Sequence, residues 1–312
     1  MATEEPNLLN VLVTGSTGFV GLPLADRLVA EGCSVIGYDP VPTPNGHEFE
    51  TVRGDLQDVH QIYRLLDQND IDTIIHSGAV SGSMLLRDDP YRIAQLNMFG
   101  TTHLIEAARA SGIPKFVYIS SSSAYGNTPP GPVDVDAPMR PGSVYSATKG
   151  AGDLLVMAYR NQFEMNIVSL RIGGLYGPGR RTWCVIKTMV ENAVAGEPTH
   201  FDWGADQSRI HLYIDETVEA ILRVAQAPDQ SPQAIYNVTH PDLVALPCIA
   251  EIVKEQIPGT EITFEPGGSE LMYRREPFDV TATARDFDFS PEIDIEDGIA
   301  RYLAWEKARV GA

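Results

Sequence analysis

The chain has 312 residues, with 42 carboxylates against 23 lysines and arginines, and 43% of its residues are hydrophobic. This size and composition exclude a disordered tail and predict one or two globular domains with a substantial core. The formal net charge of −19 disfavours nucleic acid and membrane surfaces as partners. Three cysteines without paired spacing predict neither a disulfide nor a metal site. The polar first ten residues and the lack of a long apolar segment predict a cytoplasmic location.

Up to residue 172, short β-branched segments alternate with amphipathic segments of helical length. Strands are predicted at Asn10–Thr14, Ser34–Tyr38, Glu48–Arg53, Thr73–His76, Lys115–Ser120 and Asn166–Ile172. Helices are predicted between them at Gly18–Glu31, Gln57–Gln68, Pro90–Ser111 and Val144–Phe163. This alternation is typical of a parallel sheet covered on both faces. Residues 1–172 are therefore predicted to form an α/β, doubly wound Rossmann domain that binds its ligand at the carboxyl ends of its strands.

After Gly173 the elements become shorter and are separated by glycine and proline. Helices are predicted at Thr182–Ala195, Asp215–Ala227, Ala245–Ile257 and Ile295–Trp305. Short strands are predicted at His200–Phe201, Ile210–Tyr213, Ala234–Asn237 and Glu261–Phe264. Residues 173–312 are expected to form a smaller mixed α/β domain that binds the substrate, with some exchange of chain between the two domains.

The first strand continues into the turn Thr14-Gly15-Ser16-Thr17-Gly18-Phe19-Val20-Gly21 and then into a helix. In this context the glycine spacing predicts a dinucleotide site, because glycines admit a pyrophosphate close to the backbone and the helix N-terminus attracts it. The expected cofactor contacts within the turn are Gly15, Thr17, Gly18, Phe19 and Val20. Asp39, 18 residues after Gly21, matches the carboxylate that binds the adenosine ribose. A carboxylate repels a 2′-phosphate, so NAD is predicted over NADP.

Tyr145 and Lys149 lie four residues apart at the start of a predicted helix, which places both side chains on one face. A nearby cation lowers the pKa of a phenol, which makes the phenolate available as a base near neutral pH. The pair is therefore predicted to be catalytic. A hydroxyl that binds the reacting oxygen is expected from the run Ser120-Ser121-Ser122-Ser123, although spacing does not decide which serine it is.

Taken together, these motifs resemble those of extended short-chain dehydrogenases/reductases of the NAD-dependent epimerase/dehydratase family. The resemblance covers the first 180 residues and continues more weakly toward the C-terminus. Besides the turn, Asp39 and the Tyr145/Lys149 pair, it rests on Gly54-Asp55-Leu56, His76-Ser77-Gly78-Ala79, Asn97-x-x-Gly100-Thr101, the serines before Tyr125-Gly126, and Leu170-Arg171 with Tyr176-Gly177-Pro178-Gly179.

The resemblance implies further cofactor contacts and a homodimer. Asp55 and Leu56 would contact the adenine, and Asn97 would steady the central helix. The cofactor cleft would be lined by Ser77, Gly78 and Ala79, with Tyr145 and Lys149 also facing the cofactor. The dimer would form through the two long helices, Pro90–Ser111 and Val144–Phe163.

The resemblance also assigns the catalytic hydroxyl to Ser121. Tyr145 would remove a proton from a substrate carbinol while hydride passes to NAD, with Ser121 binding the developing oxyanion and Lys149 tuning both groups. Dehydratases of the family carry an Asp-Glu pair where this chain has Ser122-Ser123, so dehydration is disfavoured.

We predict an NAD-dependent epimerase of a sugar or nucleotide sugar. One alternative is a dehydrogenase that releases NADH from a free sugar, sugar acid or polyol, since Leu170-Arg171-Ile172-Gly173 resembles uronate dehydrogenases. The other is a non-catalytic dinucleotide sensor, which the intact Tyr145/Lys149 pair disfavours.

Two arginines are the main predicted substrate contacts. Arg209 and Arg275 resemble the pair that grips a diphosphate in nucleotide-sugar epimerases, and a planar guanidinium suits phosphate. In so acidic a chain, each could instead pair with a neighbouring carboxylate. Ser81 and Ser122 are the other predicted contacts. Gly174 stands in the segment where such epimerases carry an asparagine, which removes one expected contact.

Overall fold

The computed structural model describes residues 9–311 except 83–84, 87, 228–229 and 269–272. The described chain forms two compact units. The first contains the residues up to Ala124, Pro141–Arg171 and Val218–Tyr236, and the second contains Tyr125–Arg140, Ile172–Thr217 and the residues from Asn237 onward. The chain thus crosses between the units at five places, of which the crossing after Arg171 lies beside the predicted boundary at residue 172.

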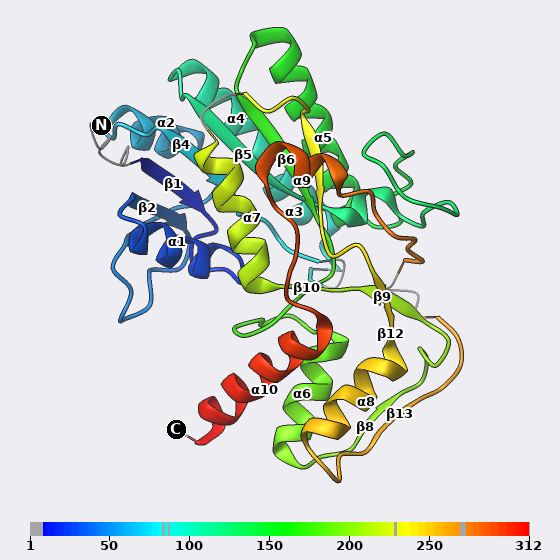
Figure 1. Ribbon diagram of the computed structural model, residues 1–312. Helices are drawn as coiled ribbons and strands as arrows, with labels where there is room; N and C mark the ends of the chain where they lie inside the picture. The colour runs from blue at the N-terminus through cyan, green and yellow to red at the C-terminus, as the bar shows by residue number, and fades with distance from the viewer. Residues whose placement is uncertain (1–8, 83–84, 87, 228–229, 269–272, 312) are drawn as a thin grey trace, which may run out of the picture. The chain divides into compact units, whose positions relative to one another are not determined.

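A seven-stranded sheet in the order β3-β2-β1-β4-β5-β6-β11 forms the centre of the first unit (Figure 1). Its strands are β1 (Asn10–Thr14), β2 (Ser34–Asp39), β3 (Glu50–Arg53), β4 (Thr73–His76), β5 (Lys115–Ser121), β6 (Ile167–Ile172) and β11 (Ile235–Val238). Strand β1 pairs in parallel with both β2 and β4, so the strand order reverses beside it. The doubly wound α/β fold predicted from the sequence is confirmed, and ligands of such sheets bind at this reversal.

Helices cover both faces of the sheet. On one face, α2 (Val59–Asp67), α4 (Gly100–Ala110) and α5 (Val144–Phe163) bury their apolar residues against Leu12, Ile74 and Phe116 of the strands. Each such fully buried aliphatic side chain contributes about 2 kcal/mol to stability. On the other face lie α1 (Gly21–Ala30) and α7 (Ile214–Gln226), which are joined by a hydrogen bond of 2.6 Å from Gln226 to Glu31.

The sequence predicted a single helix over Pro90–Ser111. The structure has a helical segment here whose hydrogen-bond pattern changes in the middle. It consists of α3 (Pro90–Ala94), a π-helical turn η1 (Gln95–Phe99) and α4. A π-turn widens the helix by one residue and is frequent at functional sites. Asn97, a predicted cofactor-site residue, lies within this turn and is buried.

The second unit has three two-stranded sheets. They pair β7 (Leu175–Tyr176) with β10 (Leu212–Tyr213), β9 (Ser208–Ile210) with β12 (Leu243–Ala245), and β8 (Thr199–Phe201) with β13 (Ile262–Phe264). Helices α6 (Val185–Ala195), α8 (Leu246–Gln256) and α10 (Ile295–Gly311) pack on one another, and the unit also contains α9 (Thr281–Phe287). The 3₁₀ turn η2 (Ser122–Tyr125) spans the crossing after Ala124.

One strand predicted for the smaller domain belongs to the main sheet instead. The strand predicted at Ala234–Asn237 is β11, the edge strand beside β6, where Ser169 N donates to the carbonyl oxygen of Ala234 at 2.8 Å. All four residues of β11 are buried, and this burial requires the apolar surface of the larger core.

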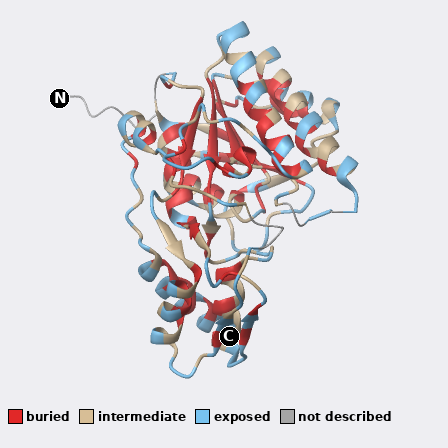
Figure 2. Cartoon of the chain, turned by 90° about the vertical axis from the view of Figure 1, so that its right-hand side faces the viewer, coloured by how far each residue is buried: buried red, intermediate tan, exposed pale blue. Residues whose placement is uncertain are grey.

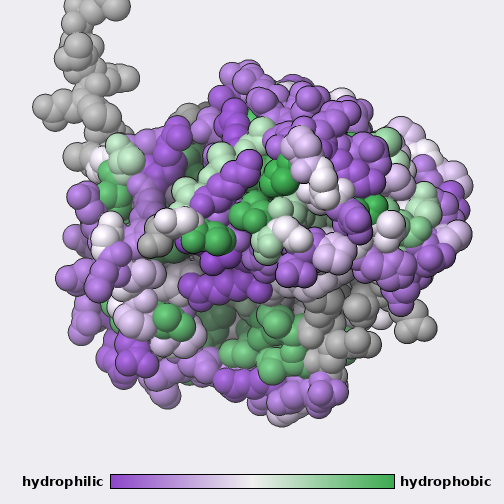
Figure 3. Space-filling model, turned by 90° about the horizontal axis from the view of Figure 1, so that it is seen from below, coloured by the Kyte–Doolittle hydropathy of each residue, from purple (hydrophilic) through white to green (hydrophobic). Residues whose placement is uncertain are grey.

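Buried residues fill the strands and the helix sides that face them, whereas exposed residues lie on the outer helix faces and the loops (Figure 2). The face drawn in Figure 3 is mainly hydrophilic, with smaller hydrophobic patches between. Among the described helices, none has the length and apolar character needed to cross a membrane.

Candidate active site

The glycine turn after β1 packs backbone against backbone with the segment that follows β4. Gly15 has a φ of +67°, and a Cβ atom on it would lie 2.7 Å from the Cα of Gly78. A Cβ atom on Gly21 would lie 2.0 Å from the carbonyl oxygen of Gly15. Both positions therefore require glycine. No side chain caps the N-terminus of α1, which leaves the start of this helix without a competing acceptor.

Asp39 is attached to this turn and is only 7% exposed. Its carboxylate accepts hydrogen bonds from the backbone N–H of Thr17 at 3.2 Å and of Val41 at 2.9 Å. It is therefore not a solvated loop acid but a fixed carboxylate beside the glycine turn. A buried carboxylate in this place fits a pair of ribose hydroxyls and repels a phosphate.

Asp55 does not cap the following helix, since Asp58 is the N-cap of α2. Its carboxylate instead accepts from the N–H of Gln57 at 3.0 Å and from the guanidinium of Arg92 at 3.2 Å. The residue stays near the carboxyl end of β3, as predicted for an adenine contact, and that role remains a prediction.

The segment after β4 and the π-turn are joined to the same region. Ser77 Oγ donates to the carbonyl oxygen of Thr14 at 2.7 Å, and the N–H of Gly78 donates to Thr14 Oγ1 at 3.1 Å. The Asn97 amide exchanges two hydrogen bonds with the backbone of Val80, at 2.8 and 3.2 Å. The structure thus brings Ser77, Gly78 and the glycine turn together.

Helix α5 presents Tyr145 and Lys149 side by side on a buried face. The helix begins after Ser143, whose Oγ accepts from the N–H of Ser146 at 3.2 Å. Tyr145 is 9% exposed and Lys149 is 4% exposed. Lys149 Nζ donates to the carbonyl oxygen of Ile119 at 2.6 Å and lies 4.9 Å from the centroid of the Tyr118 ring. Burial lowers the pKa of Lys149 to about 8, against the opposing influence of the Asp153 carboxylate.

The serines at the end of β5 differ in their contacts. Ser121 Oγ accepts from the N–H of Ser123 at 3.1 Å, and this leaves the hydroxyl proton of Ser121 available for donation. Ser122 is buried, and Ser123 Oγ is buried without a hydrogen-bond partner among the described residues. The predicted substrate contact Ser81 is exposed, and it forms no hydrogen bond with the other described site residues.

The second unit contains the two predicted phosphate-binding arginines. Arg209 is 6% exposed, and its Nη1 donates to the carbonyl oxygen of Ser208 at 2.9 Å and to Gln207 at 3.2 Å. Arg275 Nη1 donates to the carbonyl oxygen of Gly126 at 2.6 Å, and its guanidinium lies 5.0 Å from the centroid of the Tyr273 ring. Both guanidiniums are thus fixed by backbone oxygens.

The two arginines are close enough to influence each other, and neither is neutralised by an acid. Burial lowers the pKa of Arg275 to about 10, and the positive charge of Arg209 acts in the same direction while Tyr273 opposes it. In the described part of the chain, no carboxylate forms an ion pair with either arginine, and Arg209 Nε is buried without a partner. Uncompensated buried cations favour an anionic ligand. The alternative that each arginine pairs with a neighbouring acid is therefore wrong for the described residues.

Sequence reasoning missed Tyr118 and Thr148, which contact the predicted catalytic pair. The ring of Tyr118 lies beside the Lys149 ammonium, and Thr148 Oγ1 donates to the carbonyl oxygen of Tyr145 at 2.7 Å. Tyr118 stands two residues before the serine run, and Thr148 adjoins Lys149, so proximity in the sequence was the only signal.

Comparisons with known proteins agree with this geometry. Residues 11–239 match the model of the NAD dependent epimerase/dehydratase family. The UDP-glucose 4-epimerase of Mycolicibacterium smegmatis is 32% identical over an alignment of 228 residues, and the match covers 69% of this chain and 72% of that protein. The chain belongs to the NAD-dependent epimerase/dehydratase family. It is therefore an NAD-dependent enzyme of the extended short-chain dehydrogenase type.

Two further members of the family match nearly the whole chain. UDP-glucuronate 4-epimerase 1 of Arabidopsis thaliana is 26% identical, with 95% of this chain and 76% of that protein covered. The solved structure of MoeE5 in complex with UDP-glucuronic acid and NAD has a TM-score of 0.87 and 26% identity, and the match covers 97% of this chain and all of MoeE5. The family's similarity to this chain thus extends through the second unit.

Proposed function

We propose that this enzyme is a nucleotide-sugar epimerase that inverts a secondary carbinol by oxidising it transiently and reducing it again. The observation that carries the proposal is the pair Arg209, which is buried, and Arg275, which is partly buried. Two desolvated cations without an acidic partner in the described chain favour an anion, and the diphosphate of a nucleotide sugar supplies one. A free neutral sugar or polyol does not.

The first unit has the features that NAD requires. Gly15 and Gly21 keep the turn free of side chains, and Asp39 stands beside it as an acceptor for the adenosine ribose. Ser77 and Gly78 close the region on the side of β4. When bound, NAD supplies the hydride acceptor of the reaction.

Three side chains perform the proton chemistry in this proposal. Tyr145 removes the proton of the substrate hydroxyl, and the Lys149 ammonium favours the phenolate form that makes this possible. Ser121 donates a hydrogen bond to the oxygen on which charge develops, because its lone pair already accepts from Ser123 N–H. In the return step the Tyr145 hydroxyl gives the proton back to that oxygen.

The identity of the sugar follows from the relatives rather than from the contacts. Similar proteins are named for UDP-glucose and UDP-glucuronate, so a UDP-hexose or UDP-hexuronic acid is the proposed substrate. Position 174 cannot carry the asparagine found in many family members, since a Cβ atom there would lie 1.9 Å from the carbonyl oxygen of Ile210. The sugar or diphosphate contact of that asparagine must then come from another residue.

Dehydration and net dehydrogenation are the competing reactions. Ser122 and Ser123 offer no carboxylate to expel a hydroxyl group, which disfavours dehydration. A dehydrogenase of sugar acids is favoured by the Leu170-Arg171 segment, and the carboxylate of a sugar acid would also suit an arginine. The side chain of Arg171, however, is buried in an ion pair of 2.8 Å with Asp153, and this contact gives it a structural role.

The test is incubation of the purified enzyme with NAD and either UDP-glucose, UDP-glucuronic acid or free glucuronic acid. The proposal expects an epimeric UDP-sugar by NMR and no net NADH absorbance. Steady accumulation of NADH with the free acid would instead establish the dehydrogenase.

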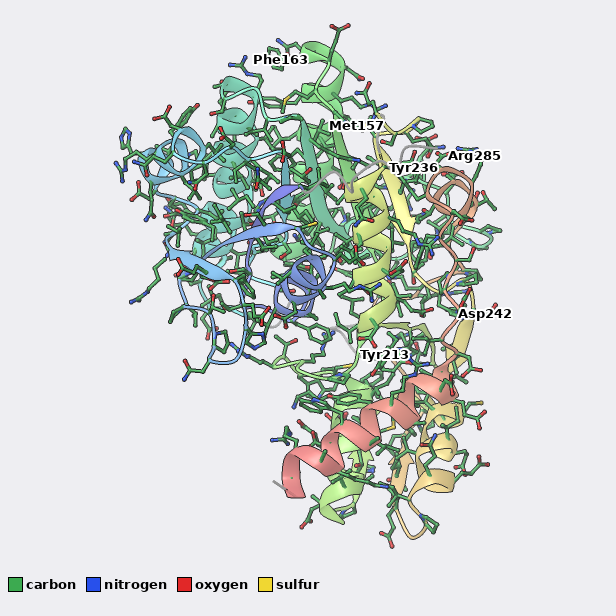
Figure 4. The ribbon with its side chains drawn as sticks, turned by 60° about the vertical axis from the view of Figure 1, so that its left-hand side comes forward. Met157, Phe163, Tyr213, Tyr236, Asp242 and Arg285 are labelled. Atoms are coloured by element: carbon green, nitrogen blue, oxygen red, sulfur yellow. The ribbon has the colours of Figure 1, made fainter. Side chains whose placement is uncertain are left out.

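We also propose a homodimer formed through α3, η1 and α5. These adjoining helices expose large apolar side chains, namely Tyr91, Phe99, Leu154, Met157 and Phe163. Met157 and Phe163 lie along α5 at the upper side of the view in Figure 4. Exposed apolar residues gathered on neighbouring helices are typical of interfaces.

Analytical ultracentrifugation of two variants tests this interface. Leu154→Glu is expected to give monomers, whereas Val310→Glu, at an exposed apolar residue of α10, should remain dimeric. If both variants are dimeric, this interface is excluded.

A further inference from the structure

His76, the last residue of β4, is a buried histidine with hydrogen bonds to two different elements. Its Nδ1 lies 2.7 Å from Thr14 Oγ1 at the end of β1, next to the glycine turn. Its Nε2 lies 2.9 Å from Thr101 Oγ1 at the start of α4. The side chain is 1% exposed, so water does not compete for either ring nitrogen.

The directions of the neighbouring hydrogen bonds determine where the proton of this ring lies. Thr101 Oγ1 is 2.6 Å from the carbonyl oxygen of Asn97, and a carbonyl oxygen can only accept. The single proton of Thr101 is used there, so Thr101 must accept from His76 Nε2–H. In a neutral ring Nδ1 is then the acceptor, and the Thr14 hydroxyl donates to it while accepting from the N–H of Gly78.

This chain of hydrogen bonds continues into α5. Asn97 lies in the π-turn, and its Nδ2 donates to Thr148 Oγ1 at 3.1 Å. Thr148 in turn donates to the carbonyl oxygen of Tyr145 at 2.7 Å. Hydrogen bonds of known direction therefore connect Gly78, beside the glycine turn, with the first turn of the helix that carries Tyr145 and Lys149. Asn97 belongs to both halves of this connection, through its carbonyl oxygen and its side-chain amide.

The charges around His76 require the neutral ring. Its centroid lies 5.6 Å from that of Tyr118, the ring that also supports the Lys149 ammonium. Burial and the positive charge of Lys149 lower the pKa of His76 to about 3. A protonated ring would donate from both nitrogens and leave the Thr14 proton without its acceptor. It would also add a second cation beside the Tyr118 ring and oppose the charge on Lys149.

We propose that neutral His76, with its proton on Nε2, is a positioning residue that couples the nucleotide-binding turn to the helix bearing Tyr145 and Lys149. The roles of Tyr145 and Lys149 in this statement rest on the proposed function. The position of the proton and the coupling rest on the hydrogen bonds, and the neutral state of the ring rests also on its burial near the Lys149 ammonium.

The tautomer is tested without any activity measurement. In protein labelled with ¹⁵N-histidine, the His76 ring is assigned by its loss in His76→Gln. We expect a protonated Nε2 and an unprotonated Nδ1 throughout about pH 6 to 8, the range in which an ordinary histidine titrates. A proton on Nδ1, or titration in this range, would overturn the proposal.

The positioning role is tested with His76→Leu and His76→Gln, with His200→Gln at an exposed histidine as the control. Leu removes both hydrogen bonds, whereas the Gln amide offers one donor and one acceptor. We expect His76→Leu to lower kcat on the order of 10- to 100-fold and to shift the pH profile of kcat, because a misplaced base loses that much rate. His76→Gln should recover part of both, and His200→Gln should behave as the wild type.

Unchanged kcat and pH profile in His76→Leu, with only a lower unfolding temperature, would reduce His76 to a structural residue. If the leucine variant does not fold, partial activity with an altered pH profile in His76→Gln supports the proposal, and a wild-type profile contradicts it. Failure of the proposed function would appear as the absence of an epimeric UDP-sugar with the wild-type enzyme, and it would leave the tautomer result untouched.

Discussion

The polar groups of the two units are satisfied in opposite ways. In the first unit, Asp39, His76, Asn97 and Lys149 have hydrogen bonds to the protein's own backbone or side chains. In the second unit, the guanidiniums of the buried Arg209 and the partly buried Arg275 have backbone acceptors but no acid in the described chain. The four side chains of the first unit therefore have their partners within the protein itself. The two guanidiniums of the second unit lack a compensating charge, which an anionic ligand would supply.

The largest effect on activity is expected from the loss of Tyr145, the proposed catalytic base in the first unit. Tyr145→Phe should lower kcat by about 10²- to 10⁴-fold, because it removes the proton acceptor while leaving the helix intact. NAD binding, followed by calorimetry, should change little. Tyr159→Phe on the same helix is the control, since its hydroxyl donates to Glu106 at 3.0 Å, away from the proposed catalytic residues. Full turnover by Tyr145→Phe would remove the basis of the mechanism.

A smaller effect, confined to the substrate, is expected at the arginines. Arg275→Met should weaken UDP binding about 10- to 100-fold, the loss expected for charged hydrogen bonds, and should leave NAD affinity unchanged. The unfolding temperature should not fall, because the variant removes an uncompensated buried charge. Arg274→Met is the matched control, as this neighbour is exposed and paired with Glu276. An equal loss of NAD affinity would contradict the distinction between the units.

The third expected effect concerns stability alone and is a pH dependence that originates at Lys149. Its pKa is 10.5 in the unfolded chain and about 8 in the folded protein. Between these values the unfolded state binds more protons, so the free energy of unfolding rises with pH. The stability advantage of Lys149→Met over the wild type should therefore be largest below pH 8 and shrink by about 3 kcal/mol toward pH 10.5.

Urea unfolding at several pH values measures this difference. Lys254→Met is the control, because Lys254 lies on the surface of α8 with Glu251 as its partner. A Lys149→Met difference that does not change with pH would show that the lysine is not desolvated.

Local sequence patterns sufficed for the strands and for the glycine turn. A segment such as Asn10–Thr14, with Val11, Leu12 and Val13 in succession, is predicted as a strand that is buried on both sides. The π-turn at Gln95–Phe99 could not be predicted, because one extra residue per turn barely alters a helical pattern of polar and apolar residues. The placement of Ile235–Val238 in the main sheet depends on a pairing with β6 that lies far away in sequence.

The residues of the candidate site likewise fall into those that the sequence predicts and those that it does not. Tyr145, Lys149 and Asp39 were predictable because their spacing to a turn or to each other carries the chemistry. The lack of an acidic partner at Arg209 and Arg275 could not be predicted. Whether an arginine pairs with an acid depends on residues that folding brings together from distant parts of the chain. The same holds for His76, whose proton position follows from Thr14 and Thr101, which are 62 and 25 residues away.

Transient oxidation of the carbinol is the central claim, and isotope retention tests it most directly. A UDP-hexose that carries deuterium on the reacting carbon is converted by the enzyme in ordinary water, and the product is examined by NMR and mass spectrometry. We predict that the epimer retains its deuterium, because the hydride taken from that carbon returns to it. Loss of deuterium to water, or its accumulation in released reduced cofactor, would contradict the account.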